Sequence, residues 1–474
     1  MLGWLPAWGS SASSDRIDGS LLVLLLLGLG LIGATCTRLL LRPPVRELHR
    51  RGTLIVRQRR WQWVPPMAAG MHADCLRLAG IAIAPADELK HFKLIGTTGT
   101  GKSTAIRELL AQALLRGDRA VISDPDGGYT RRFGSRYRGD LILNPFELES
   151  VRWDLYGELS NPYDVEQLAS ALVPTSADPA AQEWRGYSRT FVSALLRRSQ
   201  ADGRRDAAEL WRLLTVASIE ELRALLAGTP AQPFLEPDNV RMFASIRAVA
   251  VSAMAALEYI QAQRAAPFSV RAWIRAGRGA LFVPYRAGQI AALRSIIATW
   301  IRLAIVEAMN QPEQHDQRLW FVVDELDALG AIDGMKDALA RLRKFGGRCI
   351  LGFQSLAQVS TTYGHGDAQT IVENCANTLI LRCSGSEQGG TSQFASRLIG
   401  EREVIRRQRS RGRDRDGLFG ARGTRRSSQV SEQQVIESAV LPSELEQLPD
   451  LAGYFKSASS RDWARIGLRV PADR

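Results

Sequence analysis

A glycine-rich stretch ending in a lysine and hydroxyl residues is the part of the sequence best suited to hold phosphate groups. Residues 96–103 match the pattern G-x-x-x-x-G-K-[ST], in which backbone N–H groups surround a triphosphate. Glycine accepts the dihedrals that turn those groups inward. We therefore expect Lys102 to reach the outer phosphates of ATP and Ser103 to ligate Mg²⁺. The predicted cradle consists of Gly96, Thr97, Thr98, Gly99, Thr100, Gly101, Lys102, Ser103 and Thr104.

The flanks of this stretch decide whether it is a chance glycine loop. Phe92 to Ile95 is apolar and reads as a strand, and the residues after Lys102 have helical spacing. A strand, a tight turn and a helix N-terminus together favour anion binding, because the helix end carries a partial positive charge. The context therefore favours a nucleotide site over a chance loop.

Two adjacent carboxylates form the second chemical element. Asp324 and Glu325 directly follow the apolar stretch 319–323, which reads as a buried strand. In a parallel sheet that also carries the phosphate loop, Asp324 suits binding of Mg²⁺ and Glu325 suits activation of the attacking water. The sequence thus predicts a metal site formed by Ser103 and Asp324.

Three further polar residues are candidates for the same site. Gln354 ends the next predicted strand and could sense the γ-phosphate, or could be an ordinary surface glutamine. Arg343 and Arg382 are candidates to reach the γ-phosphate bound by a neighbouring subunit. A salt bridge is the alternative role for either arginine.

The order of predicted elements indicates an α/β fold with a mostly parallel sheet flanked by helices. Short apolar strands occur at 117–124, 140–144, 279–285, 348–354 and 377–383. Between them, residues 152–265 show helical spacing without extended β-branched runs, which predicts an all-α insertion. We expect the nucleotide-binding motor domain to comprise residues 90–151 and 266–474. The apolar helix 289–309 is interrupted by charges, so it reads as a core helix and not as a membrane span.

The N-terminal region predicts a membrane anchor. Residues 20–41 are almost purely apolar and long enough to cross a bilayer. Seven arginines and one acid follow in the first part of the predicted basic juxtamembrane segment 42–89. The positive-inside rule then puts the short segment 1–19 in the periplasm and the motor in the cytoplasm, as a single-pass inner-membrane protein. The alternative is a cleaved signal peptide, but the first 19 residues lack its basic start.

Charge and cysteine content limit the possible partners. The chain of 474 residues has a formal net charge of +12, which suggests nucleic acid or anionic lipid as a partner. Its five cysteines form no C-x-x-C pair and no cluster with histidine. This spacing argues against a zinc site and a disulfide framework, and fits a reducing compartment.

An arginine-rich segment at 402–426 is predicted to be a mobile loop, because it has many like charges and few apolar residues. Such a loop could line a pore and contact DNA phosphates, or could be a solvated insert. It lacks interleaved aromatic residues, so base stacking is not expected to dominate.

Several of these stretches together resemble the TraD/TrwB class of coupling proteins of bacterial conjugation, the ATPases of type IV secretion. The matching stretches are 96–104, 116–129, 138–145, 153–154, 164–174, 183–184, 322–325, 352–358 and 441–442. The resemblance implies a RecA-like P-loop core with an all-α insertion, a membrane anchor and a homohexameric ring. It also implies ATP hydrolysis that moves single-stranded DNA, delivered with a relaxase, into a type IV secretion channel.

By matching position, the resemblance implies that Lys102 and Ser103 hold the nucleotide and the metal. It also implies that Asp324 and Glu325 act at the metal and the attacking water, and that Gln354 is the sensor. Arg343 and Arg382 correspond to arginines at the active site or between subunits.

Two other functions remain open from the sequence. A double-strand DNA translocase of the FtsK/HerA type shares the motor, although no winged helix is recognisable after Leu441. A membrane scaffold that binds nucleotide without hydrolysing it is the alternative from another class, and the intact acids Asp324 and Glu325 argue against it. A transporter of protein alone is a third option, which the arginine-rich segment disfavours.

Overall fold

The computed structural model describes residues 47–57, 75–176, 178–313, 317–386, 390–414 and 425–470. The described residues form two compact units. One unit comprises residues 47–51 and 402–437, and the other comprises the remaining described residues.

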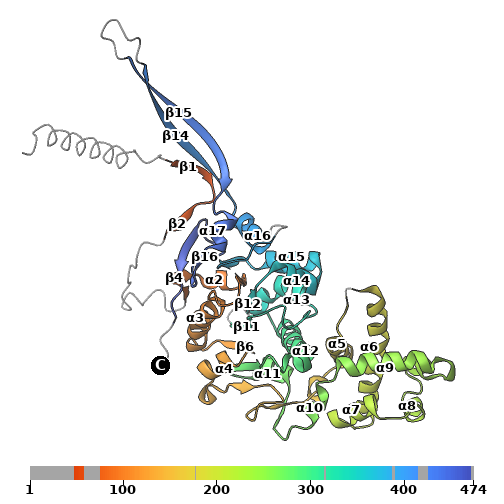
Figure 1. Cartoon of the computed structure of the whole chain (residues 1–474). Coiled ribbons are helices and arrows are strands. Elements are labelled where there is room, and N and C mark those ends of the chain that lie inside the picture. Colours follow the sequence, from red (N-terminus) through yellow and green to blue (C-terminus); the bar gives the residue numbers. More distant parts are fainter. Residues whose placement is uncertain are drawn as a thin grey trace, which may run out of the picture. The chain divides into compact units, whose positions relative to one another are not determined.

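The larger unit is built on a ten-stranded sheet (Figure 1). Its strand order is β2-β17-β16-β13-β5-β12-β11-β6-β10-β7. The seven strands from β13 to β7 are parallel, and β16 pairs antiparallel with both β13 and β17. The α/β class with a mostly parallel sheet, expected from the sequence, is confirmed. The parallel strands are β5 (Phe92–Ile95), β6 (Arg119–Pro125), β7 (Leu141–Ile142), β10 (Ala280–Tyr285), β11 (Leu319–Val323), β12 (Gly347–Phe353) and β13 (Asn377–Ile380).

One edge of the sheet is completed by β2 (Ile55–Arg57), β16 (Ala452–Lys456) and β17 (Trp463–Gly467). Chain segments far apart in sequence therefore lie side by side, because β2 pairs with β17. Two small ribbons flank the sheet, β3 (Leu76–Leu78) with β4 (Ile81–Ile83), and β8 (Arg152–Trp153) with β9 (Pro267–Phe268).

Alternating side chains of the central strands pack into different cores on the two faces of the sheet. On β6, Ala120 and Ile122 join the core under α3, whereas Val121 joins the core under α12. This alternation is the period of two expected for a strand buried on both faces. The helices around the sheet are α2 (Pro85–Glu88), α3 (Lys102–Leu115), α4 (Gly128–Phe133), α11 (Val270–Ala276), α12 (Ile290–Met309), α13 (Met335–Arg341), α14 (Leu356–Tyr363), α15 (His365–Asn374), α16 (Gly390–Ile399) and α17 (Pro442–Glu446).

The region between β8 and β9 contains only helices and turns. Its α-helices are α5 (Asp164–Leu172), α6 (Pro179–Ala201), α7 (Ala207–Thr215), α8 (Ile219–Leu225), α9 (Val240–Ala253) and α10 (Leu257–Gln261). They gather at one end of the unit, beyond α11 and α12 (Figure 1). Phe191 and Phe243, on α6 and α9, meet edge to face with ring centroids 5.1 Å apart.

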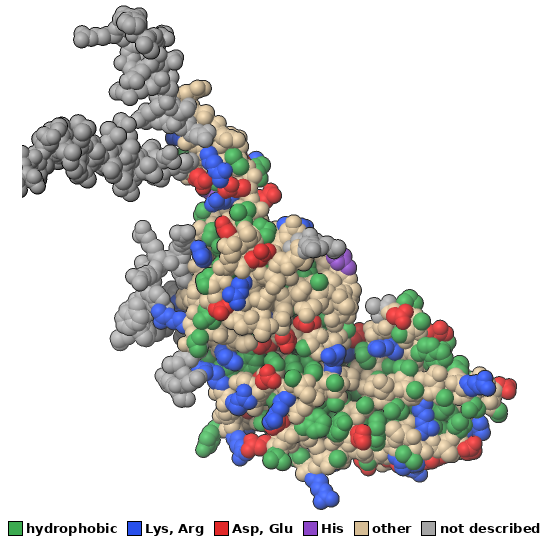
Figure 2. Space-filling model, viewed as in Figure 1, with side chains coloured by type: hydrophobic (Ala, Val, Ile, Leu, Met, Phe, Trp, Pro, Cys, Tyr) green, Lys and Arg blue, Asp and Glu red, His purple; other side chains and the backbone are tan. Residues whose placement is uncertain are grey.

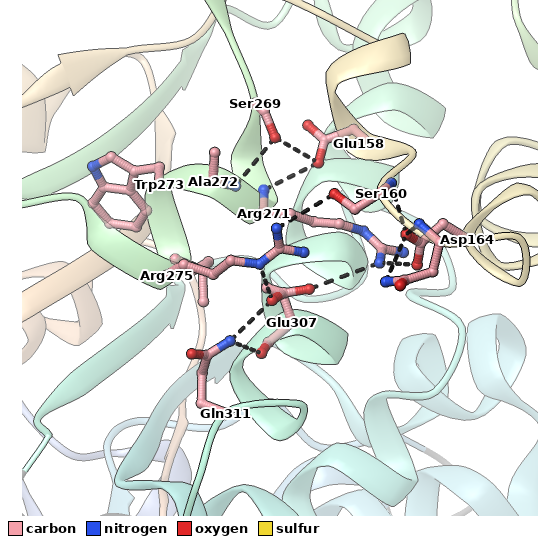
Figure 3. A network of polar contacts seen from close by, with 12 residues as sticks. Glu158, Ser160, Asp164, Ser269, Arg271, Ala272, Trp273, Arg275, Glu307 and Gln311 are labelled. Carbon is pink, nitrogen blue, oxygen red and sulfur yellow. Dashed lines mark hydrogen bonds and ion pairs between the residues drawn. The ribbon is translucent and has the colours of Figure 1, made fainter. Parts of the chain in front are cut away.

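A buried ionic network joins this helical region to α11 and α12 (Figure 3). Arg271 on α11 is 1% exposed and donates to Asp164 of α5 at 2.5 Å. Glu307 on α12 accepts from Arg275 at 2.6 Å. Glu158 accepts from the backbone N–H groups of Val270 and Arg271, so it caps the start of α11. Each of these buried groups is paired or hydrogen-bonded, which is the condition under which such groups are tolerated.

The smaller unit is a three-stranded sheet of β1 (Glu47–Gly52), β14 (Glu401–Asp414) and β15 (Arg425–Ser438). The prediction of a mobile loop is therefore wrong for residues 402–414 and 425–426, which lie in strands; residues 415–424 lie outside the described part.

Ion pairs across the strands explain how such a basic segment can be ordered. Arg402 pairs with Glu437 at 2.8 Å and Arg407 with Glu432 at 2.6 Å, while Glu403 faces arginines of β1. Acids brought in from neighbouring strands offset the repulsion that the basic segment shows when it is considered alone.

The predicted periplasmic segment 1–19 and membrane helix 20–41 lie outside the described residues, as does part of the juxtamembrane segment 42–89. Among the described residues, no helix combines the length and apolar character needed to cross a bilayer. On the face seen in Figure 2, Lys and Arg side chains of the larger unit are interspersed with acids and do not gather in one patch.

Candidate nucleotide-binding site

The register of the parallel sheet brings the ends of four strands together. Val323, the last residue of β11, pairs with Leu351 of β12 and with Ser123 of β6. On the other side of β12, Phe353 pairs with Ile95 of β5. Residues that follow these strands therefore share the carboxyl edge of the sheet, although they come from positions more than 200 residues apart in the chain.

The glycine-rich loop turns from β5 into α3 at this edge. Gly99 has φ +78° and Gly101 φ +119°, values that non-glycine residues adopt only at a cost. The Lys102 ammonium lies inside the curled loop and donates to the carbonyl oxygens of Gly96 at 2.6 Å and Thr97 at 3.2 Å. Burial lowers the pKa of Lys102, and the nearby carboxylates of Asp324 and Glu325 oppose this shift.

The phosphate loop and the tip of β11 meet through a hydrogen bond. The Ser103 hydroxyl on the first turn of α3 donates to Asp324 Oδ2 at 2.7 Å. The Asp324 residue is 6% exposed. A hydroxyl and a carboxylate oxygen are the ligands that Mg²⁺ takes from a P-loop site. The two residues predicted to hold the metal are thus in direct contact.

A second chain of hydrogen bonds runs beside the first. Thr98 donates from its hydroxyl to Gln354 Oε1 at 3.1 Å, and Gln354 donates from Nε2 to Glu325 Oε1. The loop tip, the predicted sensor and the predicted water-activating acid are therefore linked in a line. The Gln354 side chain therefore connects Thr98 to Glu325 by hydrogen bonds, so a displacement of Thr98 can reach Glu325 through it.

The two candidate arginines lie in different places. Arg382 follows β13, and its carbonyl oxygen accepts from Thr97 N at 2.9 Å, but its guanidinium pairs with Asp450 at 2.7 Å. Arg343 lies four residues before β12 begins, at the amino edge of the sheet, and its charge acts on buried His91. The structure thus brings Arg382 to the rim of the loop and leaves Arg343 at the opposite edge within the same chain.

Tyr129 is a site residue that our sequence reasoning did not single out. Its hydroxyl donates to Asp324 Oδ2 at 2.7 Å, and the residue is 2% exposed. The available signal was an aspartate at the end of β6, Asp124, followed by glycines and an aromatic residue. Sequence alone could not show that this turn faces β11, because the β6–β11 pairing joins segments about 200 residues apart.

The segment after α17 also supports the loop, a contact that no pattern in the sequence predicts. Leu451 N donates to the Thr100 carbonyl at 2.9 Å. A Cβ atom built on Gly101 would lie 3.0 Å from Leu451 Cδ2, a tighter contact than side chains normally make. Glycine at position 101 is therefore required both for its dihedral angle and for this packing.

These residues fit a magnesium nucleotide. The loop curls around the Lys102 ammonium, and Ser103 and Asp324, which would hold the metal, are joined by a hydrogen bond beside it. Among the described residues, no cluster of three or more His, Cys, Asp or Glu side chains could hold a metal by itself. Ser103 and Asp324 would supply two oxygen ligands to Mg²⁺, and oxygens of the nucleotide or of water would supply the others.

Comparison with known proteins gives consistent results. Residues 75–469 match the family described as the type IV secretion-system coupling protein DNA-binding domain. The coupling protein TraD of Escherichia coli (strain K12) is 32% identical over 392 residues, covering 80% of this chain and 52% of TraD. The chain thus spans about half the length of that relative.

Solved structures of the plasmid coupling protein TrwB also resemble the chain. TrwB in complex with ADP and Mg²⁺ superposes with a TM-score of 0.77, at 30% identity, covering 90% of this chain and 95% of TrwB. TrwB in complex with the non-hydrolysable ATP analogue ADPNP gives a TM-score of 0.76 at the same identity, covering 90% of this chain and 96% of TrwB.

Proposed function

Since the chain belongs to the family of type IV secretion-system coupling proteins, we propose that it is an ATPase that drives single-stranded DNA into a secretion channel during bacterial conjugation. The observation that carries the proposal is the contact between Ser103 and Asp324, which joins the phosphate loop to the acidic tip of β11. The complexes of TrwB with ADP and Mg²⁺ and with ADPNP support nucleotide binding by this chain.

Each residue at the carboxyl edge has a distinct role in this proposal. The loop 96–104 and Lys102 hold the phosphates of ATP, and Ser103 and Asp324 hold Mg²⁺. Magnesium supplies positive charge that offsets the charge developing on the transferred phosphoryl group. Glu325 orients and activates water, and Gln354, hydrogen-bonded to both Thr98 and Glu325, carries the state of the site onward.

The wider function follows from the family and remains part of the proposal. The chain is anchored in the bacterial inner membrane by residues 20–41 with the motor in the cytoplasm, and it assembles as a homohexamer. It receives a relaxase bound to single-stranded DNA and passes it to the secretion channel. Arg382 at the rim of the loop is the better candidate to reach a nucleotide bound by a neighbouring subunit, because Arg343 lies at the far edge.

Phosphate release by the full chain, titrated with single-stranded and duplex DNA, tests the proposal. We expect single strands to stimulate turnover more than duplex, and Lys102→Ala and Glu325→Gln each to lower turnover about a hundredfold or more. Glu258→Gln, which neutralises an exposed acid on α10, is the matched control and should leave turnover unchanged.

The same assay separates the alternatives. Stronger stimulation by duplex would favour a double-strand translocase. Nucleotide binding without phosphate release under any DNA condition would favour a scaffold. Turnover by either Lys102→Ala or Glu325→Gln at the parent rate would overturn the assignment of the site. The residues after Leu441 bear on the first alternative, the double-strand translocase. The described ones form α17, β16 and β17, and these two strands belong to the central sheet.

A further inference from the structure

Two hydroxyl groups converge on a single oxygen of Asp324. Ser103 Oγ and Tyr129 Oη both donate to Oδ2, each at 2.7 Å. Ser103 belongs to the phosphate loop motif, but Tyr129 lies outside it, on the first turn of α4. The second donor therefore needs its own explanation.

The turn between β6 and α4 is built to hold Tyr129 in place. Asp124, fully buried at the end of β6, accepts from the backbone N–H groups of Tyr129 at 2.9 Å and Thr130 at 2.6 Å. Asp126 and Gly127 both have positive φ, +59° and +65°. Because a non-glycine residue rarely adopts this conformation, the turn is held by its hydrogen bonds and not by local preference.

The phenol is also fixed at its ring and confined to the neutral form. The Arg107 guanidinium of α3 lies 5.8 Å from the ring centroid. Burial, followed by the charge of Asp324, raises the pKa of Tyr129 well above its ordinary value of 10. The phenol donates to a carboxylate, and hydrogen bonds to a charged acceptor are stronger than those between neutral groups.

The hydrogen bonds from Ser103 and Tyr129 restrict the orientation of the Asp324 carboxylate. With two donors on Oδ2, rotation of the carboxylate would break two hydrogen bonds at once. The other oxygen, Oδ1, faces Gly352 of β12, where a Cβ atom would lie 3.3 Å from it. The carboxylate is thus held in one orientation by the two hydroxyls on Oδ2, beside the close-packed backbone of Gly352.

We propose that Tyr129 is a positioning residue for magnesium: it holds the Asp324 carboxylate in the orientation that receives the ion together with Ser103. The proposal rests on the proposed function of the site as a Mg²⁺–nucleotide site. It differs from a purely structural role, in which Tyr129 would fill the core under α3 and affect folding alone.

Tyr129→Phe tests the proposal, because it keeps the ring and removes only the hydroxyl. The measurement is the Mg²⁺ concentration that gives half-maximal ADP binding by the full chain at equilibrium, followed by the same titration of ATP turnover. We expect that concentration to rise roughly tenfold, the order of one hydrogen bond to a charged group. Turnover at saturating Mg²⁺ should stay within about twofold of the parent, since the orientation is restored once the ion binds.

Tyr156→Phe is the matched control. Tyr156 is a buried tyrosine in the region between β8 and β9, and its hydroxyl lies near Ser199 and not near Asp324. We expect this variant to bind Mg²⁺ and ADP like the parent. An unchanged Mg²⁺ requirement in Tyr129→Phe, with a lower melting temperature, would overturn the proposal and leave a structural role.

A second variant, Thr130→Val, tests the proposal if Tyr129→Phe does not fold. The Thr130 hydroxyl donates to Asp124 at 2.6 Å, so Thr130→Val loosens the turn without touching Asp324. It should raise the Mg²⁺ requirement by a smaller factor, about threefold; no rise would count against the proposal.

The binding titration also keeps the two proposals apart. If the parent binds ADP with Mg²⁺ but never turns over ATP, the proposed motor function fails while the comparison with Tyr129→Phe still decides the role of Tyr129. If the parent does not bind nucleotide at any Mg²⁺ concentration, both proposals fail.

Discussion

The two edges of the central sheet use the same strands for opposite purposes. At the amino edge, buried Glu88 accepts from Arg116 at 2.9 Å and from Arg348 at 3.1 Å. Asp118 accepts from Arg116 and from the indole of Trp320. Acids at this edge are matched by basic partners within the chain.

At the carboxyl edge, acids lie beside hydroxyls and an amide. Asp324 receives hydrogen bonds from Ser103 and Tyr129, and Glu325 receives one from Gln354. Hydroxyl and amide donors leave the negative charge of these carboxylates uncompensated, apart from nearby Lys102. The amino edge is thus built for stability, whereas the carboxyl edge keeps negative charge available for a cation.

The largest effect is expected at the amino edge. Glu88→Gln leaves the buried Arg348 guanidinium without its carboxylate, and breaking a buried pair costs about 3–5 kcal/mol of unfolding free energy. Denaturant unfolding of the full chain measures this loss, while the ADP affinity of the folded fraction should stay constant. Asp367→Asn, which breaks the exposed pair with Lys336, is the control and should be close to the parent. A comparable loss of unfolding free energy in Glu88→Gln and Asp367→Asn would mean that the ion pairs of the amino edge stabilise the fold no more than an exposed pair does.

The next effect belongs to the carboxyl edge and should appear in turnover. Asp324→Asn removes the charge proposed to hold Mg²⁺, so ATP turnover should fall about a hundredfold, close to 3 kcal/mol in the barrier. Unfolding free energy should change by less than about 1 kcal/mol, since Asn can still accept from Ser103 and Tyr129. A large loss of stability with normal turnover would mean that this edge, too, is structural.

The smallest effect is a pH dependence at the amino edge. His91 is buried, with Nε2 donating to the Leu339 carbonyl at 2.9 Å and Nδ1 accepting from Cys349 N at 3.0 Å. Burial lowers its pKa from 6.5 to about 4. Between these values the unfolded chain binds the proton and the folded chain does not, so stability falls as the pH decreases from 6.5 towards 4.

The corresponding loss is about 2 kcal/mol by pH 5. Unfolding free energies of the parent and of His91→Gln, measured at pH 7 and pH 5, give the contribution of this residue as the difference in slope. Equal slopes would contradict the assignment of His91 as a neutral, fully bonded group.

Local patterns were enough to predict much of the fold and of the site. The strand before Gly96, the helix from Lys102 and the strand before Asp324 are each set by apolar spacing within a few residues. Parallel strands place their carboxyl ends at one edge, so the meeting of Ser103 with Asp324 was foreseeable from the class of sheet alone.

Long-range pairing decided the remaining features. Tyr129 reaches Asp324 only because β6 lies next to β11, and Leu451 supports the loop only because β16 returns to the sheet beside β13. In the arginine-rich segment, arginines pair with acids of β15 and Glu403 pairs with arginines of β1, which no count of its own charges could reveal. The sequence by itself determined the chemical groups and the ends of the strands that carry them, since those depend on neighbours along the chain. Only the tertiary structure decided which other groups, Tyr129 and Leu451 among them, join that site, because strand order is set by packing between distant segments.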